Sequence, residues 1–182
     1  MKFCSNCAQK VDYQAVEGDH RLRFVCNHCM TIHYQNPRII VGCVPVWEDK
    51  VLLCRRGIEP QLGFWNLPGG FYEIGESLET GAMREAMEEA GLSMKIGRML
   101  GIYSVLHAAQ VHIHYEGILD HDKFCLTPES TEIKFFSENE IPWSELAFQS
   151  NTLSLKHYFE CRNSGNWSTK QKEYYVNFER ES

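Results

Sequence analysis

The chain of 182 residues has no recognisable secretory leader, no hydrophobic run long enough to cross a membrane, and no repeated or low-complexity segment. We therefore expect neither a secreted nor a membrane-spanning protein, and no solenoid fold. The expected location is the cytoplasm, a reducing compartment in which protein thiols seldom form disulfides.

The chain also lacks an excess of positive charge. Its formal net charge is −6, and residues 1–36 carry only four basic side chains, Lys2, Lys10, Arg21 and Arg23. This falls short of the basic stripe with which proteins bind the phosphate backbone of nucleic acids. We therefore do not expect nucleic acid as a partner.

Cysteine, by contrast, is abundant, and four of the eight cysteines have a regular spacing near the start of the chain. Cys4-x2-Cys7 is followed after eighteen residues by Cys26-x2-Cys29. This spacing is typical of a zinc ribbon, whereas two disulfides or four free thiols are the alternative. Because four thiolates leave no open coordination position, the expected Zn²⁺ is structural, and we expect the ribbon to serve in dimerisation or packing.

Other cysteines and histidines lack such spacing. His28 and His33 lie near the cysteine pairs in sequence, and we expect them to be surface neighbours of the zinc site. As scattered single cysteines, the remaining four are predicted to be small buried hydrophobic residues: Cys43, Cys54, Cys125 and Cys161.

Length and composition indicate one full hydrophobic core with a small appendage. Hydrophobic residues make up 43% of the chain, and an appendage of ~35 residues needs a metal because it cannot bury enough apolar surface. Pro37 disfavours helix before it, and a strand pattern begins just after it. The predicted division is a ribbon over residues 1–36, a main domain over 37–150, and a partly helical tail over 151–182 that packs on the main domain.

Alternating apolar residues predict most of the strands of the main domain. Residues 39–47 and 50–56 form a hairpin around Glu48 and Asp49, and residues 95–106, 110–119 and 132–137 form further strands. Pro142 is expected to open a short helix, and residues 153–162 have a helical pattern.

Residues 70–92, GFYEIGESLETGAMREAMEEAGL, form a glycine-rich loop that continues into a helix. Ser77 is the expected N-cap, the helix covers residues 78–90, and Gly91 ends it. The apolar stripe expected to be buried is Ala82, Met83, Ala86, Met87 and Ala90.

Three carboxylates share one face of this helix. Glu85, Glu88 and Glu89 stand at i, i+3 and i+4, where like charges repel and require a compensating cation. Oxygen ligands select Mg²⁺ or Mn²⁺. Arg84 can reach both Glu88 and Glu76, so we expect Arg84 and Glu76 to tie the loop to the helix.

This stretch matches the Nudix box, G-x5-E-x7-R-E-U-x-E-E-x-G-U, position for position. Seven residues fill the fixed positions of this motif: Gly70, Glu76, Arg84, Glu85, Glu88, Glu89 and Gly91. Ala86 and Leu92 fill its two apolar positions. The chain therefore resembles the Nudix hydrolases that carry a four-cysteine ribbon. The resemblance implies an α/β/α sandwich with a mixed sheet.

The resemblance also implies an activity, the Mg²⁺-dependent hydrolysis of a nucleoside diphosphate linked to another moiety, giving two phosphate monoesters. Its metal ligands correspond to Glu85, Glu88, Glu89 and the backbone carbonyl of Gly69. Such ions neutralise the diphosphate and lower the pKa of an attacking water. Glu88, Glu129 and Glu132 are the candidates for the general base, and the last two could equally be solvated turn residues.

Candidate substrate contacts surround the loop. Arg55 and Arg56 end a strand near the box, and a guanidinium group fits diphosphate oxygens. Four aromatic residues near the loop could stack on a base: Phe64, Trp65, Phe71 and Tyr72. Of these, we expect Trp65 to support the loop by packing. Glu73 could line the site or cap the loop.

His112, His114 and Glu116 alternate along a predicted strand and so share one face. They could form a second metal site or, as we expect, a polar sheet face or an interface, because His-x-His alone is a weak motif. Glu116 is a further candidate for the active cleft.

The substrate is the least constrained feature. The ribbon, NPRIIVG before the box and IPWSELAFQS after it resemble ribbon-bearing Nudix hydrolases that act on ADP-ribose or FAD. The SQPWPFP run of the similar NADH pyrophosphatases is absent, as are a coenzyme A signature and the proline that ADP-ribose-specific relatives carry beyond the box, where this chain has LHAAQV. Hydrolysis of NADH or of dinucleoside polyphosphates is the alternative activity. A non-catalytic nucleotide sensor or a nucleic-acid-binding module is the alternative of another class.

Overall fold

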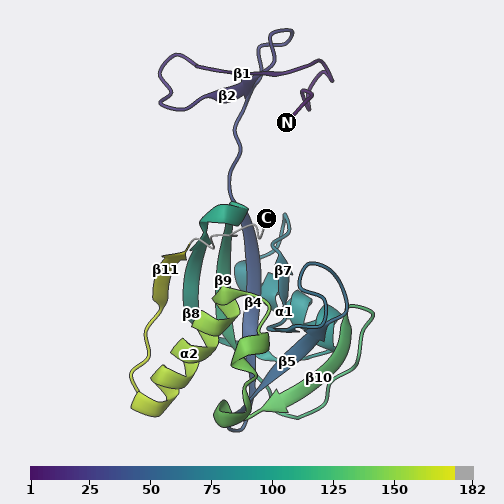
Figure 1. Ribbon diagram of the computed structural model, residues 1–182, viewed down its shortest axis with the longest axis vertical. Coiled ribbons are helices and arrows are strands. Elements are labelled where there is room, and N and C mark those ends of the chain that lie inside the picture. Colours follow the sequence, from purple (N-terminus) through teal and green to yellow (C-terminus); the bar gives the residue numbers. More distant parts are fainter. Residues whose placement is uncertain (175–182) are drawn as a thin grey trace, which may run out of the picture. The chain divides into compact units, whose positions relative to one another are not determined.

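The computed structural model describes residues 1–174, which divide into two compact units, Met1–Pro37 and the residues from Arg38 onward (Figure 1). The first unit is a three-stranded antiparallel sheet in the order β1-β2-β3. Cys4, Val25 and Cys26 are buried in it, and this small core alone is too little to stabilise 37 residues. Its strands are β1 (Asp12–Gln14), β2 (Arg23–Val25) and β3 (Ile32–His33).

The second unit contains one mixed sheet, as predicted. Among the described residues its main path runs β10-β5-β4-β9-β8-β11, with β6 paired to β5 and β7 paired to β4. The pairs β4–β9 and β8–β11 are parallel, and the other pairs are antiparallel. The strands are β4 (Arg38–Trp47), β5 (Lys50–Arg56), β6 (Trp65–Asn66), β7 (Gly69–Phe71), β8 (Lys95–Val105), β9 (Gln110–Ile118), β10 (Ser130–Phe136) and β11 (Lys170–Tyr174).

Two helices cover opposite faces of this sheet. Alternate residues of β4 point to opposite sides: Val41 and Cys43 pack with alanines of α1 (Leu78–Ala90), whereas Val44 packs with Leu155 of α2 (Gln149–Ser164). Figure 1 shows α2 across the near face, over β8 and β9, and α1 behind the sheet. The predicted α/β/α sandwich is therefore confirmed. Short 3-10 turns are η1 (Leu106–Ala108), η2 (Glu138–Glu140) and η3 (Trp143–Glu145).

The helix of the box begins and ends where the sequence predicts. The Ser77 hydroxyl accepts a hydrogen bond from the Thr80 N–H, and Gly91 has a left-handed backbone with φ 62°. The predicted apolar stripe is partly wrong, because Met87 is 49% exposed while Glu85 and Glu89 are buried. The sheet thus contacts the row of Ala82, Ala86 and Ala90 together with the neighbouring row that carries the two glutamates.

The segment after residue 148 is more ordered than the helical pattern alone indicates. Helix α2 begins four residues before the predicted range, so the expected division at residues 150 and 151 falls inside it. Its buried face includes polar residues, among them Ser150 and Ser154, and a hydrophobic pattern cannot detect these. Strand β11 was not predicted because Lys170–Tyr174 is largely polar. The rest of the expected tail, residues 175–182, lies outside the described residues.

Three of the four cysteines outside the ribbon are buried as predicted, but Cys125 is exposed, so the prediction is wrong for Cys125. Cys125 lies on the loop before β10, where its N–H donates to the carbonyl of Ala90 at the end of α1. The backbone rather than the thiol therefore makes the tertiary contact.

Among residues 1–174, no helix is both long enough and apolar enough to pass through a membrane.

Candidate functional site

Arg84 connects the box loop to the box helix. Its Nε and Nη2 donate to the two carboxylate oxygens of Glu76 at 3.1 and 2.8 Å, and Nη2 also donates to the carbonyl of Phe71 at 2.9 Å. Nη1 donates to Glu85 at 2.7 Å and to Glu88 at 3.0 Å. The hydrogen bonds from Arg84 lower the pKa of Glu76, and those carboxylates raise the pKa of Arg84. One guanidinium group therefore fixes three carboxylates and the end of β7.

Glycines bring β7 against α1. A Cβ atom at Gly70 would lie 2.5 Å from Oε2 of Glu85, and one at Gly69 would lie 2.8 Å from the carbonyl oxygen of Val41. No side chain fits in either place without displacing its neighbour. The backbone of Gly70 therefore lies directly beside the carboxylate of Glu85, and that of Gly69 lies against β4.

Glu85 and Glu89 are buried, at 9% and 8% exposure, and Glu85 shares its ion-pair partner Arg84 with two further carboxylates. Burial raises the pKa of Glu85, although Arg84 opposes the shift. Burial and then the neighbouring Glu85 raise the pKa of Glu89 to about 8, against the opposing effects of Arg56 and of a hydrogen bond from the backbone of Gly69. Glu89 is therefore fully ionised at neutral pH only if a further cation lies beside it.

The end of the loop before β10 brings Glu129 to this pair, whereas Glu132 lies within β10. Glu129 lines a small recess together with Glu89 and Arg56, and its charge raises the pKa of Glu89. The Thr127 hydroxyl donates to the carbonyl of Glu89 at 3.0 Å. Glu132 instead accepts from Nη1 of Arg55 at 3.3 Å. The structure thus brings Glu129, but not Glu132, to the box glutamates.

The two arginines at the end of β5 differ in their surroundings. Arg55 donates to the carbonyl of Gly63 at 2.8 Å and lies over the ring of Trp65. Arg56 donates to the carbonyl of Pro60 at 2.7 Å, lies over Phe148, and lines the recess that contains Glu89. Arg56 is therefore the arginine that faces the carboxylates.

The aromatic residues around the loop also separate into two kinds. Trp65 is buried and packs edge-on against Phe136 with ring centroids 4.9 Å apart, so it supports the core. Phe71 is 48% exposed and available to a ligand. Tyr72 donates to the carbonyl of Glu76 at 2.6 Å, and the Glu73 N–H donates to the Glu76 carboxylate, so both stabilise the loop.

His112, His114 and Glu116 do share one face of β9, and all three are buried. His112 pairs with Ser150 at 2.9 Å and His114 with Ser154 at 2.6 Å, both serines belonging to α2. Glu116 lies in a separate recess with Arg98, away from the box glycines. In the described part of the chain these three residues form no metal-binding cluster, and the histidines instead form the polar face expected beneath a helix.

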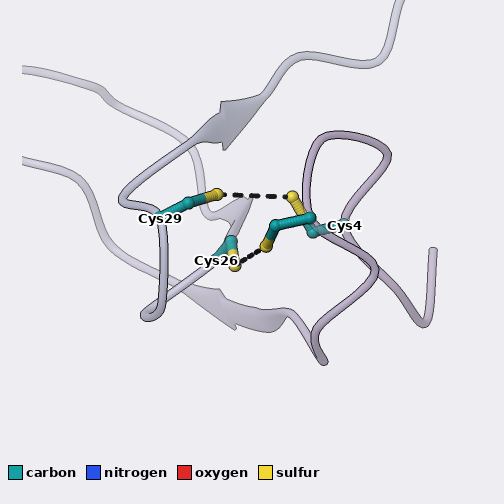
Figure 2. Close-up of side chains that lie close together, drawn as sticks. Cys4, Cys26 and Cys29 are labelled. Carbon is teal, nitrogen blue, oxygen red and sulfur yellow. Dashed lines mark hydrogen bonds between the residues drawn. The ribbon is translucent and has the colours of Figure 1, made fainter.

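The four cysteines of the ribbon converge. Their sulfur atoms all lie within 4.8 Å of one another, the only such group of potential metal ligands among residues 1–174. Figure 2 shows the sulfurs of Cys4, Cys26 and Cys29 directed toward one point. This arrangement of thiols fits tetrahedral Zn²⁺. The three box glutamates do not converge this closely.

His33 was predicted to be a surface neighbour of the cysteines, and this is wrong. It is only 9% exposed, and its Nε2 lies 3.3 Å from the sulfur of Cys4. His33 pairs with Phe24 across β2 and β3, and strand alternation turns its ring inward. His28 is exposed, as expected.

Sequence reasoning missed several residues near the box glycines. Asn66, Phe148 and Asn151 line a recess with Gly69 and Gly70, yet they lie on two segments far apart in the sequence, β6 and the start of α2. The sequence offered one signal for them, the amide of Asn66 within the apolar run FWNLP. In the structure Asn66 is 4% exposed, and a buried amide needs hydrogen-bond partners.

Comparisons with known proteins agree with this geometry. Residues 36–168 match the model of the NUDIX domain, and residues 2–35 match that of the Nudix N-terminal zinc ribbon. The chain is 32% identical over 136 residues to an ADP-ribose pyrophosphatase of Methanocaldococcus jannaschii, covering 71% of this chain and 78% of that protein. It is 34% identical over 96 residues to the NAD-capped RNA hydrolase NudC of Salmonella heidelberg, covering 52% of this chain but only 35% of that protein. The crystal structure of a NUDIX hydrolase from Nitrosomonas europaea superposes with a TM-score of 0.93 at 43% identity, covering 97% of this chain and 100% of that one.

Proposed function

The chain belongs to the NUDIX domain family, and we propose that it hydrolyses the diphosphate bond of a nucleoside diphosphate linked to another moiety, with ADP-ribose or FAD as the leading substrate. The observation that carries this proposal is a pair of buried carboxylates beside the box glycines, Glu85 against Gly70 and Glu89 hydrogen-bonded to the backbone of Gly69. Two phosphate monoesters are the expected products.

The donor set of this site fits a hard divalent cation. Glu85, Glu88, Glu89 and the carbonyl of Gly69 offer only oxygen atoms, which favours Mg²⁺ or Mn²⁺ over softer metals. The raised pKa values of Glu85 and Glu89 support this fit, because a bound cation would stabilise the ionised form of both groups. When bound, such a cation supplies charge neutralisation to the diphosphate and acidity to a water molecule.

The chain's own residues have separate roles in this proposal. Arg84 and Glu76 hold the box loop against the helix and orient Glu85 and Glu88. Arg56, at the recess of Glu89, binds a diphosphate oxygen through its guanidinium group. Phe71 contacts the substrate through its exposed ring, whereas Trp65, Arg55 and Glu73 act by packing and by hydrogen bonds within the protein.

We propose Glu129 as the general base. It lies beside Glu89 and Arg56, and in the described part of the chain no arginine or lysine is within ion-pair distance of it, so its carboxylate oxygens are free to accept a proton from the attacking water. Glu88 is bound to Arg84 and Glu132 to Arg55, so one oxygen of each carboxylate already accepts a hydrogen bond from an arginine.

The four cysteines of the first unit would hold a structural Zn²⁺ that stabilises the ribbon, since no ligand position is left for water. The expected partner of the whole chain is a small nucleotide. A cytoplasmic location and a homodimer that involves the ribbon are also part of this proposal, and light scattering on the full chain tests the dimer.

One assay tests the proposed activity. The protein is incubated with Mg²⁺ and, separately, with ADP-ribose, FAD, NADH and a diadenosine polyphosphate, and the products are identified. NADH is included because of the similarity to a protein named as an NAD-capped RNA hydrolase. We expect AMP and a second phosphate monoester from ADP-ribose or FAD.

Glu89→Gln provides the decisive variant, since it removes a ligand charge with little change of shape. We expect it to lose turnover while its circular dichroism spectrum stays that of the wild type, with Glu145→Gln, an exposed residue, as the control. Undiminished turnover by Glu89→Gln would contradict the proposed ligand set, and absence of products from every substrate would contradict the activity.

A further inference from the structure

A recess of about 220 Å³ lies on the α2 side of the sheet and extends from the box glycines. Its walls are apolar side chains, including Ile40, Leu67 and Phe71, and the ring of Phe148 just before α2. Its volume is below the range typical of whole-ligand pockets, so it suits one ring system rather than a complete dinucleotide.

Two buried amides line this recess and bond to each other. The Asn151 Nδ2 donates to the Asn66 Oδ1 at 2.6 Å, and the side chains are 3% and 4% exposed. Within residues 1–174 this bond leaves both N–H groups of Asn66, the second N–H of Asn151 and the carbonyl oxygen of Asn151 without a partner. If both amides were turned over, N–H donors and a carbonyl acceptor would still remain, so the presence of both kinds of group does not depend on how the amides are assigned.

The recess contains no carboxylate, and its histidines are neutral at physiological pH. Burial lowers the pKa of His112 to about 4 and that of His114 to about 3. Arg56 is the one charged residue that lines the recess in the described part of the chain, and its Nε is already bound to the carbonyl of Pro60. The interior therefore suits an uncharged ring with one donor and one acceptor along an edge.

The recess adjoins the carboxylate site. Arg56 and Asn66 line both this recess and the smaller one that contains Glu89 and Glu129. Gly69 borders the recess, and its backbone also hydrogen-bonds to Glu89. A ring held here is thus attached to a diphosphate that reaches the glutamates.

We infer that this recess binds the adenine ring of the substrate and that Asn66 and Asn151 recognise its edge, with Phe71 and Phe148 as apolar contacts. The inference rests on the proposed function and assigns the adenosine half of the substrate to this face. Adenine presents an amino donor next to a ring-nitrogen acceptor, which an amide pairs with. Guanine also presents two adjacent donors on one edge, and the recess has no carboxylate to accept them.

Binding of mononucleotides without metal tests this inference separately from hydrolysis. The full chain, with its zinc, is titrated calorimetrically with AMP, GMP, UMP and nicotinamide mononucleotide. We expect AMP to bind at least about ten-fold more tightly than the other three, in line with the discrimination of a good amide–base pair. Equal affinities would overturn the inference, as would preferential binding of nicotinamide mononucleotide, which would place the other half of the substrate here.

Asn151→Leu removes the amide while keeping its approximate volume. We expect the preference for AMP over GMP to fall about ten-fold or more, whereas Asn163→Ala, an exposed asparagine on the same helix, leaves the preference unchanged. A folded Asn151→Leu protein with the wild-type preference overturns the inference.

Should Asn151→Leu fail to fold, Phe148→Leu serves instead, because it removes a ring that precedes the helix. We expect weaker AMP binding from it, and wild-type affinity would overturn the inference. Selective AMP binding without any hydrolysis would contradict the proposed function alone. Hydrolysis without selectivity for adenine would contradict the inference alone.

Discussion

The hydroxyl of Thr127 donates a hydrogen bond of 3.0 Å to the backbone carbonyl of Glu89. This bond joins the loop that carries Glu129 to the helix that carries the buried carboxylates. A second bond, from the Cys125 N–H to the carbonyl of Ala90, fixes the same loop to the end of that helix. The position of Glu129 thus depends on contacts made by its neighbours.

Replacing Thr127 with valine removes this bond while keeping a branched side chain of similar size. We expect kcat to fall about five-fold, because a net hydrogen bond contributes about 1 kcal/mol to holding the loop, and KM to change less. Thr127→Ser keeps the hydroxyl and should restore kcat. Steady-state kinetics on the three proteins decides the matter, and an unchanged kcat in Thr127→Val would show that the bond does not position Glu129.

Glu129 and Glu132 stand three residues apart and provide a matched pair of substitutions. We expect Glu129→Gln to lower kcat by roughly 10²- to 10⁴-fold, the usual contribution of a general base. Glu132→Gln should lower kcat by no more than about three-fold, because an exposed ion pair such as that with Arg55 contributes little. The reverse order of effects would assign the base to Glu132.

Local signals suffice to predict the box helix. Ser77 and Gly91 define its ends, because a hydroxyl cap and a left-handed glycine act within a few residues of the backbone they stabilise. The strands of the sheet follow from alternation for the same reason. Met87 illustrates the limit: helical periodicity gives the stripe, but the close approach of β7 decides which edge of the stripe is buried.

Contacts between distant segments are not accessible to such reasoning. Asn66 and Asn151 are 85 residues apart, and their pairing depends on where α2 begins against the sheet. The choice between Glu129 and Glu132 depends on a register shift in the pairing of β10 with β5, between Ser130 and Glu132, which no spacing reveals. His33 is buried because of its register with Phe24.

Gly70→Ala tests the close packing beneath Glu85. The added Cβ would lie 2.5 Å from the carboxylate, so Glu85 must move away from residue 70 and from Arg84. We expect loss of more than about 90% of kcat/KM and weaker binding of Mn²⁺, measured by electron paramagnetic resonance, since a ligand displaced by about 1 Å can lower the rate about 100-fold.

Gly97→Ala is the control for this substitution, because a Cβ there would meet the carboxylate of Glu116 at 2.7 Å, outside the site. Similar losses of stability are expected for both variants, but activity should fall only for Gly70→Ala. Equal activity in the two would show that the approach of Gly70 to Glu85 has no part in catalysis.

His112 and His114 make the stability of the second unit depend on pH. Burial lowers the pKa of His112 from 6.5 to about 4 and that of His114 from 6.5 to about 3, so the folded chain binds fewer protons than the unfolded chain between these values. The free energy of unfolding is therefore largest above pH 6.5 and decreases as the pH falls from 6.5 toward 4, by on the order of 3 kcal/mol for either histidine. His114→Asn should reduce this decrease, as measured by urea unfolding at pH 7 and pH 5.

His121→Asn, on the loop after β9, is the matched control for this measurement, because His121 is much less buried. Acid also protonates the cysteine thiolates of the ribbon, but that effect is common to all three proteins and cancels when their slopes are compared. We expect the wild type and His121→Asn to lose stability in parallel and His114→Asn to lose less. If the free energy of unfolding fell equally with pH in all three proteins, His114 would be protonated as readily in the folded chain as in the unfolded one. Its hydrogen bond to Ser154 would then also form with the protonated ring.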